Sequence, residues 1–158
     1  MTATTVLRES LVYLLKEGGA HSDFDSAVDE FPPDLRGVRP PNAPHSAWEL
    51  LEHMRIAQSD ILEFTRDPKH VSPDFPSGYW PKTPAPPHAE AWDESIKAFQ
   101  QDRRDLVEIT QTTADLLAPI PHGDGQTVLR QLLLVADHNS YHLGQFLLVR
   151  RLLGAWRK

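Results

Sequence analysis

The sequence predicts an all-α fold, a four-helix bundle with a long proline-rich connection between helices 2 and 3. Three observations lead to this prediction. Apolar residues recur at helical spacing in four stretches, prolines and glycines separate those stretches, and no strand pattern of comparable strength occurs. With 158 residues, of which 40% are hydrophobic, the chain has the size of one domain, residues 1–158, around a single core.

The first helix is expected to begin at a cap formed by Thr4 or Thr5 and to end at Gly18-Gly19. Its helical stripe consists of Leu7, Leu11, Leu14 and Leu15. One short helical turn is expected before Pro32-Pro33, and the prolines of residues 39–44 (RPPNAP) indicate a loop.

The second helix is predicted to open at Ser46, which stands in capping-box relation to Glu49, and to run to about Asp67, just before Pro68. At 100° per residue, His53 falls on the edge of the apolar stripe and should point inward or nearly so. That stripe consists of Leu50, Met54, Ala57, Ile61 and Phe64.

Residues 68–88 contain seven prolines and no helical period, so they form the long connection. Its aromatic residues Phe75, Tyr79 and Trp80 favour a loop that packs on the bundle. The third helix is predicted from Ala89 to Leu117 and is closed by Pro119 and Pro121. Its inner face is expected to carry Trp92, Ile96, Phe99, Leu106, Ile109 and Leu116.

The fourth helix is predicted from Thr127 to Leu153, ending at Gly154, and has apolar residues on most of its sides. One face holds Leu129, Leu133, Ala136, Leu143 and Leu147. Almost opposite lie His138 and His142, beside Val135, Val149, Gln131 and Gln145. The helix should therefore have two inward-looking sides, one packed in the bundle and one lining a pocket or an interface.

Composition excludes several classes of function. A net charge of −6 without a Lys/Arg cluster argues against a general nucleic-acid or anionic-membrane binder. Because the chain has no cysteine, a metal site must use His, Asp or Glu. The N-terminal MTATTVLRES lacks the features of a signal peptide, so a cytoplasmic location is expected. The longest apolar stretch, residues 128–149, is too often interrupted by polar groups to span a membrane.

His138 and His142 stand four residues apart, a spacing that lets two imidazoles on adjacent helical turns bind one ion. The eight histidines of the chain would give roughly a third of one such pair by chance, so the spacing alone does not decide. His53 is the natural third ligand, which would complete three protein ligands with an open position. The alternative is three hydrogen-bonded core histidines.

The remaining candidates each have a structural interpretation. His21, His45, His70, His88 and His122 lie in loops or at helix ends, where solvated surface is the default. Glu49 caps its helix, although it is also placed to support His53 or to act as a fourth ligand. Tyr79 and Trp80 are loop anchors or part of the pocket wall over the metal end, and Trp48 and Trp92 belong to the core or an interface.

Three segments together resemble the DinB-like (DinB/YfiT) superfamily: SAWELLEHMRIAQSDILEF, the YWP of the long loop, and DHNSYHLGQFLLVRRLLG. The resemblance covers essentially the whole chain. It implies a four-helix bundle that holds a divalent metal through one His of the second helix and two of the last, the latter in an H-x-x-x-H-x-G-Q pattern. The matching positions are His53, His138, His142, Gly144 and Gln145.

The resemblance implies a metal-dependent transferase or isomerase that uses a low-molecular-weight thiol such as bacillithiol or mycothiol. We expect one divalent ion, zinc or nickel by preference and iron or manganese as further options, which activates a small-molecule thiol or water. A metal-dependent hydrolase and a non-catalytic stress or interaction bundle are the alternatives. The sequence indicates no general base, because Asp137 projects away from His138 and Glu49 and Asp60 have no evident role in catalysis.

A homodimer is also expected, because the fourth helix carries more apolar residues than one core can take. The pocket can absorb one side, which leaves Leu134 and Leu148, with Trp156 beyond them, at the surface of a monomer. Twofold pairing would bury them. Alternatively, the N-terminal segment or the 68–88 loop covers these leucines.

Overall fold

The computed structural model describes residues 2–17 and 19–156, and their regular elements are all helical. The helices are α1 (Ala3–Glu17), α2 (Phe24–Val28), α3 (Ala47–Arg66), α4 (Ala91–Thr112) and α5 (Val128–Leu152), with single 3-10 turns η1 (Pro33–Leu35) and η2 (Ser77–Tyr79). Over these residues the only β-type pairing is an isolated bridge between Pro119 and Thr127. The all-α prediction is confirmed.

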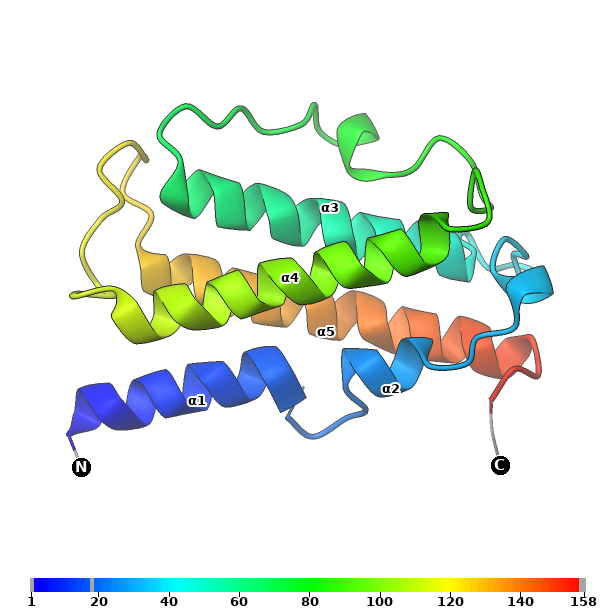
Figure 1. Cartoon of the computed structure of the whole chain (residues 1–158), viewed down its shortest axis with the longest axis horizontal. Helices are drawn as coiled ribbons and strands as arrows, with labels where there is room; N and C mark the ends of the chain where they lie inside the picture. Colours follow the sequence, from blue (N-terminus) through cyan, green and yellow to red (C-terminus); the bar gives the residue numbers. More distant parts are fainter. Residues whose placement is uncertain (1, 18, 157–158) are drawn as a thin grey trace.

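The four long helices α1, α3, α4 and α5 form the predicted bundle (Figure 1). The most extensive contacts of α3 are with α5 and α4, and α1 packs against α4 and α5. The short helix α2 follows α1 along the same edge of the molecule, toward the end where α5 finishes (Figure 1). Within the described segments, no helix is long and apolar enough to cross a membrane.

The core consists of two clusters that follow one another along the bundle. The larger one surrounds Trp48, Trp92 and Phe146 and joins α2, α3, α4 and α5. The smaller one, with Leu11 and Leu132 among its members, fastens α1 onto the other end of the bundle. Trp48 and Trp92 are 4% and 1% exposed and thus belong to the core, as expected.

The first helix begins two or three residues earlier than predicted. Thr2 caps it in place of Thr4 or Thr5, since the Thr2 hydroxyl accepts a hydrogen bond from the Thr5 backbone N–H at 3.2 Å. The helix was predicted to end at Gly18-Gly19, and Gly18 lies outside the described residues. Gly19 has a φ of +73°, the left-handed conformation in which a glycine commonly follows a helix.

The predicted capping box of α3 is confirmed and sets the start of the helix that carries His53. The Ser46 hydroxyl accepts from the Glu49 N–H at 3.2 Å, and the Glu49 carboxylate accepts from the Ser46 N–H at 2.8 Å. The helix ends at Arg66, with Asp67 as its C-cap, as predicted. The position of His53 in the second turn therefore follows from a local signal.

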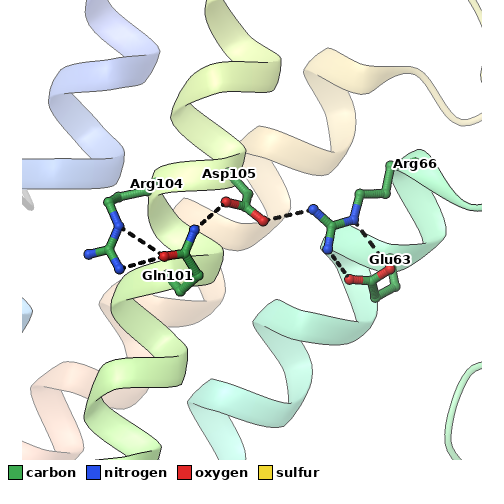
Figure 2. Close-up of polar contacts among 5 residues, drawn as sticks. All are labelled: Glu63, Arg66, Gln101, Arg104 and Asp105. Atoms are coloured by element: carbon green, nitrogen blue, oxygen red, sulfur yellow. Dashed lines mark hydrogen bonds and ion pairs between the residues drawn. The ribbon is translucent and has the colours of Figure 1, made fainter.

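A polar network ties the far end of α3 to α4 (Figure 2). Arg66 donates to Glu63 on its own helix and, at 2.7 Å, to Asp105 on α4. Gln101 also donates to Asp105, and Arg104 donates to Gln101. Because these groups are partly or fully solvent-exposed, each ion pair stabilises by about 1 kcal/mol at most. The network's main effect is to fix how the two helices lie against each other.

The third long helix ends before the predicted Leu117. The chain leaves α4 at Thr113, which is extended, and the Arg8 guanidinium of α1 donates to the Thr113 carbonyl at 2.7 Å. Arg8 therefore satisfies carbonyls that a longer helix would have bonded internally. Leu116 is still buried, because the chain turns back so that its carbonyl accepts from the Leu129 N–H.

The expectation of two separate inward faces on the last helix was wrong. The helix presents one buried face that lies between the two predicted ones, and Leu133, assigned to the core, is 47% exposed. The buried residues are Gln131, Leu132, Val135, His142, Leu143, Phe146, Val149 and Arg150. The histidine side is thus continuous with the core face, which places His142 between α5 and α3.

The 68–88 connection runs along α3 (Figure 1). Asp60 of α3 holds it at two points: its carboxylate accepts from the Tyr79 hydroxyl at 2.7 Å and lies 2.7 Å from Nε2 of His70. Phe75 does not contribute to this packing as predicted, since it is 88% exposed. The loop is therefore anchored mainly by polar contacts and by Trp80, which packs against the larger core cluster.

Candidate metal centre

Three histidines from two helices meet in the interior of the bundle. His53 projects from the second turn of α3, and His138 and His142 project from adjacent turns of α5. His53 and His142 are each only 8% exposed, and His138 is half-buried. The sequence-predicted trio is brought together by the packing of α3 against α5.

The meeting atoms are the Nε2 nitrogens. Nε2 of His53 lies 3.0 Å from Nε2 of His142 and 3.1 Å from Nε2 of His138. One potential ligand atom from each of the three rings falls within a span of 4.8 Å, so the group could hold a metal ion. No other group of three or more His, Asp or Glu side chains in the described segments meets the same test.

Hydrogen bonds on the far side of two rings fix which nitrogen carries the proton. Nδ1 of His53 lies 2.8 Å from the Tyr79 carbonyl oxygen, and Nδ1 of His142 lies 3.0 Å from the side-chain oxygen of Gln145. Both oxygens can only accept, so each Nδ1 is the donor. In the neutral rings the Nε2 atoms therefore carry lone pairs, and these face one another.

This arrangement fits a metal ion. Two lone pairs 3.0 Å apart cannot form a hydrogen bond with each other, whereas a cation between them accepts both. Imidazole nitrogens about 2.0–2.1 Å from an ion are about 2.9 Å apart at a right angle and about 3.3 Å apart at the tetrahedral angle. The two Nε2–Nε2 separations of 3.0 and 3.1 Å lie between these limits.

The surroundings keep the rings in the neutral form that binds metals. Burial, followed by the charge of the neighbouring His142 and His53 rings, lowers the pKa of His138 to about 4. Burial and then the charge of His53 lower the pKa of His142 to about 4 as well. Burial also lowers the pKa of His53, against the effect of its bond to the Tyr79 carbonyl. The three side chains therefore offer uncharged nitrogen donors near neutral pH.

Trp80 covers one side of the cluster. Its ring stacks on His53 with centroids 3.9 Å apart and planes 1° apart. His45 stacks on the opposite face of Trp80 at 4.0 Å, so the indole is held between two imidazoles. The long loop thus supplies a wall to the histidine cluster through Trp80 and a hydrogen-bond acceptor through the Tyr79 backbone.

The nearby carboxylates do not point into the cluster. Glu49 is engaged by Arg39 and by the Ser46 N–H of its own capping box, so the structure places it at the helix start and not beside His53 as a fourth ligand. Asp60 is engaged by Tyr79 and His70. Among the described residues, the candidate ligand set is therefore three neutral imidazoles without a carboxylate.

Sequence reasoning missed two histidines that are not solvated surface. His45 is half-buried against Trp80, and His70 is bonded to Asp60. Asp60 itself stands seven residues after His53, which is two turns along the same helix. That spacing could have indicated that Asp60 lies on the same side of α3 as His53. No comparable local signal existed for His45 or for the Tyr79 carbonyl, since both depend on how separate segments pack.

One comparison with known proteins identifies a family. The sequence model described as DinB superfamily matches residues 19–146, a segment that contains all three histidines. No curated protein and no solved structure matches the chain.

Proposed function

The chain belongs to the DinB superfamily, and from this premise we propose that it is a metal-dependent enzyme whose His53, His138 and His142 hold one divalent ion for chemistry on a small molecule. The observation that carries the proposal is the meeting of three Nε2 atoms, with the proton of His53 and of His142 held on the opposite nitrogen. Without a metal ion, the unprotonated Nε2 atoms of His53 and His142 would face each other at 3.0 Å with no hydrogen bond between them.

The donor set suggests the class of reaction. A divalent ion bound here would lower the pKa of a thiol or water that joins it and leave its charge free to hold the resulting anion. The three neutral rings leave the full charge of the ion uncompensated, which favours an anionic co-ligand. Since the chain has no cysteine, a thiol has to arrive with a small molecule. Because the resemblance to the DinB-like superfamily implies a low-molecular-weight thiol as co-substrate, we propose the thiol-dependent transferase class, with a hydrolase that activates water as the alternative.

The protein's own groups would position and shield the reacting molecule. The Tyr79 carbonyl and the Gln145 amide orient two of the ligands, and Trp80 excludes water from one side of His53. The carboxylates of Glu49 and Asp60 are committed to other partners. The proton released by a thiol or water would therefore pass to solvent or to the substrate and not to one of these carboxylates.

A given nitrogen site generally binds nickel and zinc more tightly than iron or manganese, so we expect zinc or nickel by preference. The deciding experiment measures bound metal in the purified protein and in the variants His53→Ala, His138→Ala and His142→Ala. We expect about one equivalent of metal in the wild type and little bound metal in each variant. The metal affinity of each variant should fall by more than the roughly 10–100-fold that removal of an outer hydrogen-bond partner costs. His88→Ala is the matched control, because His88 is exposed and outside the cluster.

Equal metal content in all four variants and the wild type would reject the site. Activity is tested next, by screening low-molecular-weight thiols for metal-dependent conjugation to electrophiles. The spectrum of the Co(II)-loaded protein separates an enzyme from a passive metal binder, because a thiol that reaches the ion adds a charge-transfer band. A loaded protein whose spectrum no thiol or anion changes would favour the non-catalytic alternative.

A further inference from the structure

Two of the cavities on the molecule differ in their relation to the histidine cluster, although none of the three histidines lines either of them. The larger, about 500 Å³, lies near α2 and the start of α4, and neither Tyr79, Trp80 nor Gln145 lines it. The smaller, about 280 Å³, lies between the segment that precedes α3 and the last turns of α5. Two of its lining residues, His45 and Gln145, also belong to the surroundings of the cluster.

The smaller cavity has a mostly apolar wall. Its polar lining groups are limited to Asn42, His45 and Gln145, among the residues the structure describes. The apolar lining consists of Pro41, Ala43, Pro44, Leu50, Leu148, Val149 and Leu152. Pockets for drug-sized ligands span roughly 300–1,000 Å³ and have this kind of wall. A cavity of 280 Å³ is at the lower limit, so its guest has to be compact.

Gln145 connects this cavity to the cluster. The oxygen of its amide accepts from Nδ1 of His142, while the same side chain lines the cavity. His45 makes a second connection, because it lines the cavity and stacks on Trp80, which in turn stacks on His53. A molecule in the cavity would thus be separated from His142 by one side chain, Gln145, and from His53 by two, His45 and Trp80.

We propose that the cavity between residues 41–45 and α5 seats a compact aliphatic or aromatic group of the small molecule that reacts at the metal centre. This inference rests on the proposed function and adds the chemical class of the substrate's non-reacting part. A large polar body, such as a sugar, would leave its hydroxyls unpaired against the proline and leucine wall. The hydrogen-bonding groups of the guest belong at the end where His45 and Gln145 lie.

A side chain of a second copy is the competing guest inside the cavity itself, because the wall residues Leu148 and Leu152 are 56% and 58% exposed. A small guest explains the site better. An apolar side chain of another subunit would bury the polar groups of His45 and Gln145 without offering them hydrogen bonds, and burying such groups unpaired is unfavourable. A small molecule with an acceptor or donor beside its apolar group satisfies both ends of the cavity.

The test uses 4-fluorobenzyl alcohol as the probe and ¹⁹F NMR as the readout, on the full chain loaded with Zn(II) or Co(II). Ala43→Phe fills the cavity and should raise the Kd of the probe by about tenfold or more, that is by at least about 1.4 kcal/mol. The matched control, Ala118→Phe, adds the same ring at an exposed position in the connection between α4 and α5 and should leave the Kd unchanged. Leu152→Asn, at an exposed wall position, provides a second variant that does not threaten the fold.

Two results would overturn the proposal. The probe's Kd is unchanged by both Ala43→Phe and Leu152→Asn, or Co(II) leaves the ¹⁹F relaxation of the bound probe as it is with Zn(II). The proposed function fails separately, if metal analysis finds no bound ion. In that case the diamagnetic ¹⁹F shift still reports whether the cavity takes the probe.

Discussion

At the residue scale, the candidate centre depends on atoms that do not themselves face an ion. The Tyr79 carbonyl and the Gln145 side chain each hold the Nδ1 proton of one candidate ligand, and so decide which nitrogen of that ring is free. Such outer partners orient imidazoles and raise their basicity. A ligand without its partner can turn or take the other tautomer, which weakens binding even though the ligand remains.

Gln145→Leu should therefore weaken metal binding by about tenfold while the helix content stays unchanged. The reason is that Nδ1 of His142 loses its acceptor, 3.0 Å away. Competition with a chromogenic chelator measures the affinity. Gln111→Leu makes the same change at an exposed position at the end of α4 and should have no effect. Identical affinities of the Gln145 and Gln111 variants would show that His142 does not need this bond.

Trp80 should report metal binding through its fluorescence, because it stacks on His53 at 3.9 Å. Adding Co(II) to the metal-free protein is expected to quench the emission, and Trp80→Phe should remove most of that quenching. Trp156→Phe is the control, since Trp156 is 40% exposed and packs on Arg151. Quenching that survives in the Trp80 variant and disappears in the Trp156 variant would place the ion elsewhere.

At the element scale, the loop of residues 68–88 and the helix α3 act as one unit. Asp60 holds the loop through Tyr79 and His70, and the loop in turn places the Tyr79 carbonyl on His53. Burial, and then the bond to Asp60 and its charge, raise the pKa of Tyr79 to about 12. The folded state therefore keeps the phenol protonated more strongly than the unfolded chain does, and stability declines as the pH rises from about 10 to about 12.

Asp60→Asn should release the loop and lower the pKa of Tyr79 toward its ordinary value, because the negative charge that disfavours the phenolate is removed. An absorbance titration of tyrosine ionisation measures the pKa, and hydrogen exchange of residues 68–88 measures the release. Asp74→Asn, on the exposed part of the same loop, should change neither. If amide protection in the loop is the same in Asp60→Asn as in the wild type, Asp60 does not anchor it.

At the scale of the whole molecule, α5 carries an apolar stripe that nothing in the described chain covers. Its members lie on one side of the helix: Leu134, Tyr141, Leu148 and Leu152, which are 38%, 65%, 56% and 58% exposed. The alternative expectation, that the N-terminal segment or the long loop covers the leucines, was wrong. Trp156, which follows the stripe, is 40% exposed, in agreement with the expectation that it lies at the surface of a single chain.

We predict that two copies of the chain pair through this stripe, because twofold pairing lets one apolar patch cover its own copy. Light scattering at micromolar concentration should give about twice the 17.9 kDa of the chain. Leu134→Glu should restore the monomer mass, and Leu134 lies outside the cavity described above. Leu117→Glu is the control, because Leu117 is 64% exposed away from the stripe. A wild-type mass near that of one chain would reject the dimer.

The sequence by itself determined that the fold is helical, where α3 begins, and which three histidines form the candidate cluster. Caps and helical periodicity depend on residues three or four apart, so Ser46 with Glu49 marked the start of α3, and His138 with His142 fell on adjacent turns. The trio could be named because its spacing matched the family's pattern. These local signals could not show which side of each helix faces the core.

Only the tertiary structure decided which side of α5 is buried, since its apolar residues occupy most sides and periodicity cannot choose among them. It also decided where α4 ends, because Arg8, more than a hundred residues away in sequence, bonds its last carbonyls. The partners of the histidines belong to the same class: the Tyr79 carbonyl lies 26 residues from His53, and His45 reaches Trp80 only through packing. Contacts between distant segments depend on the free energy of the whole core, which no short stretch of sequence encodes.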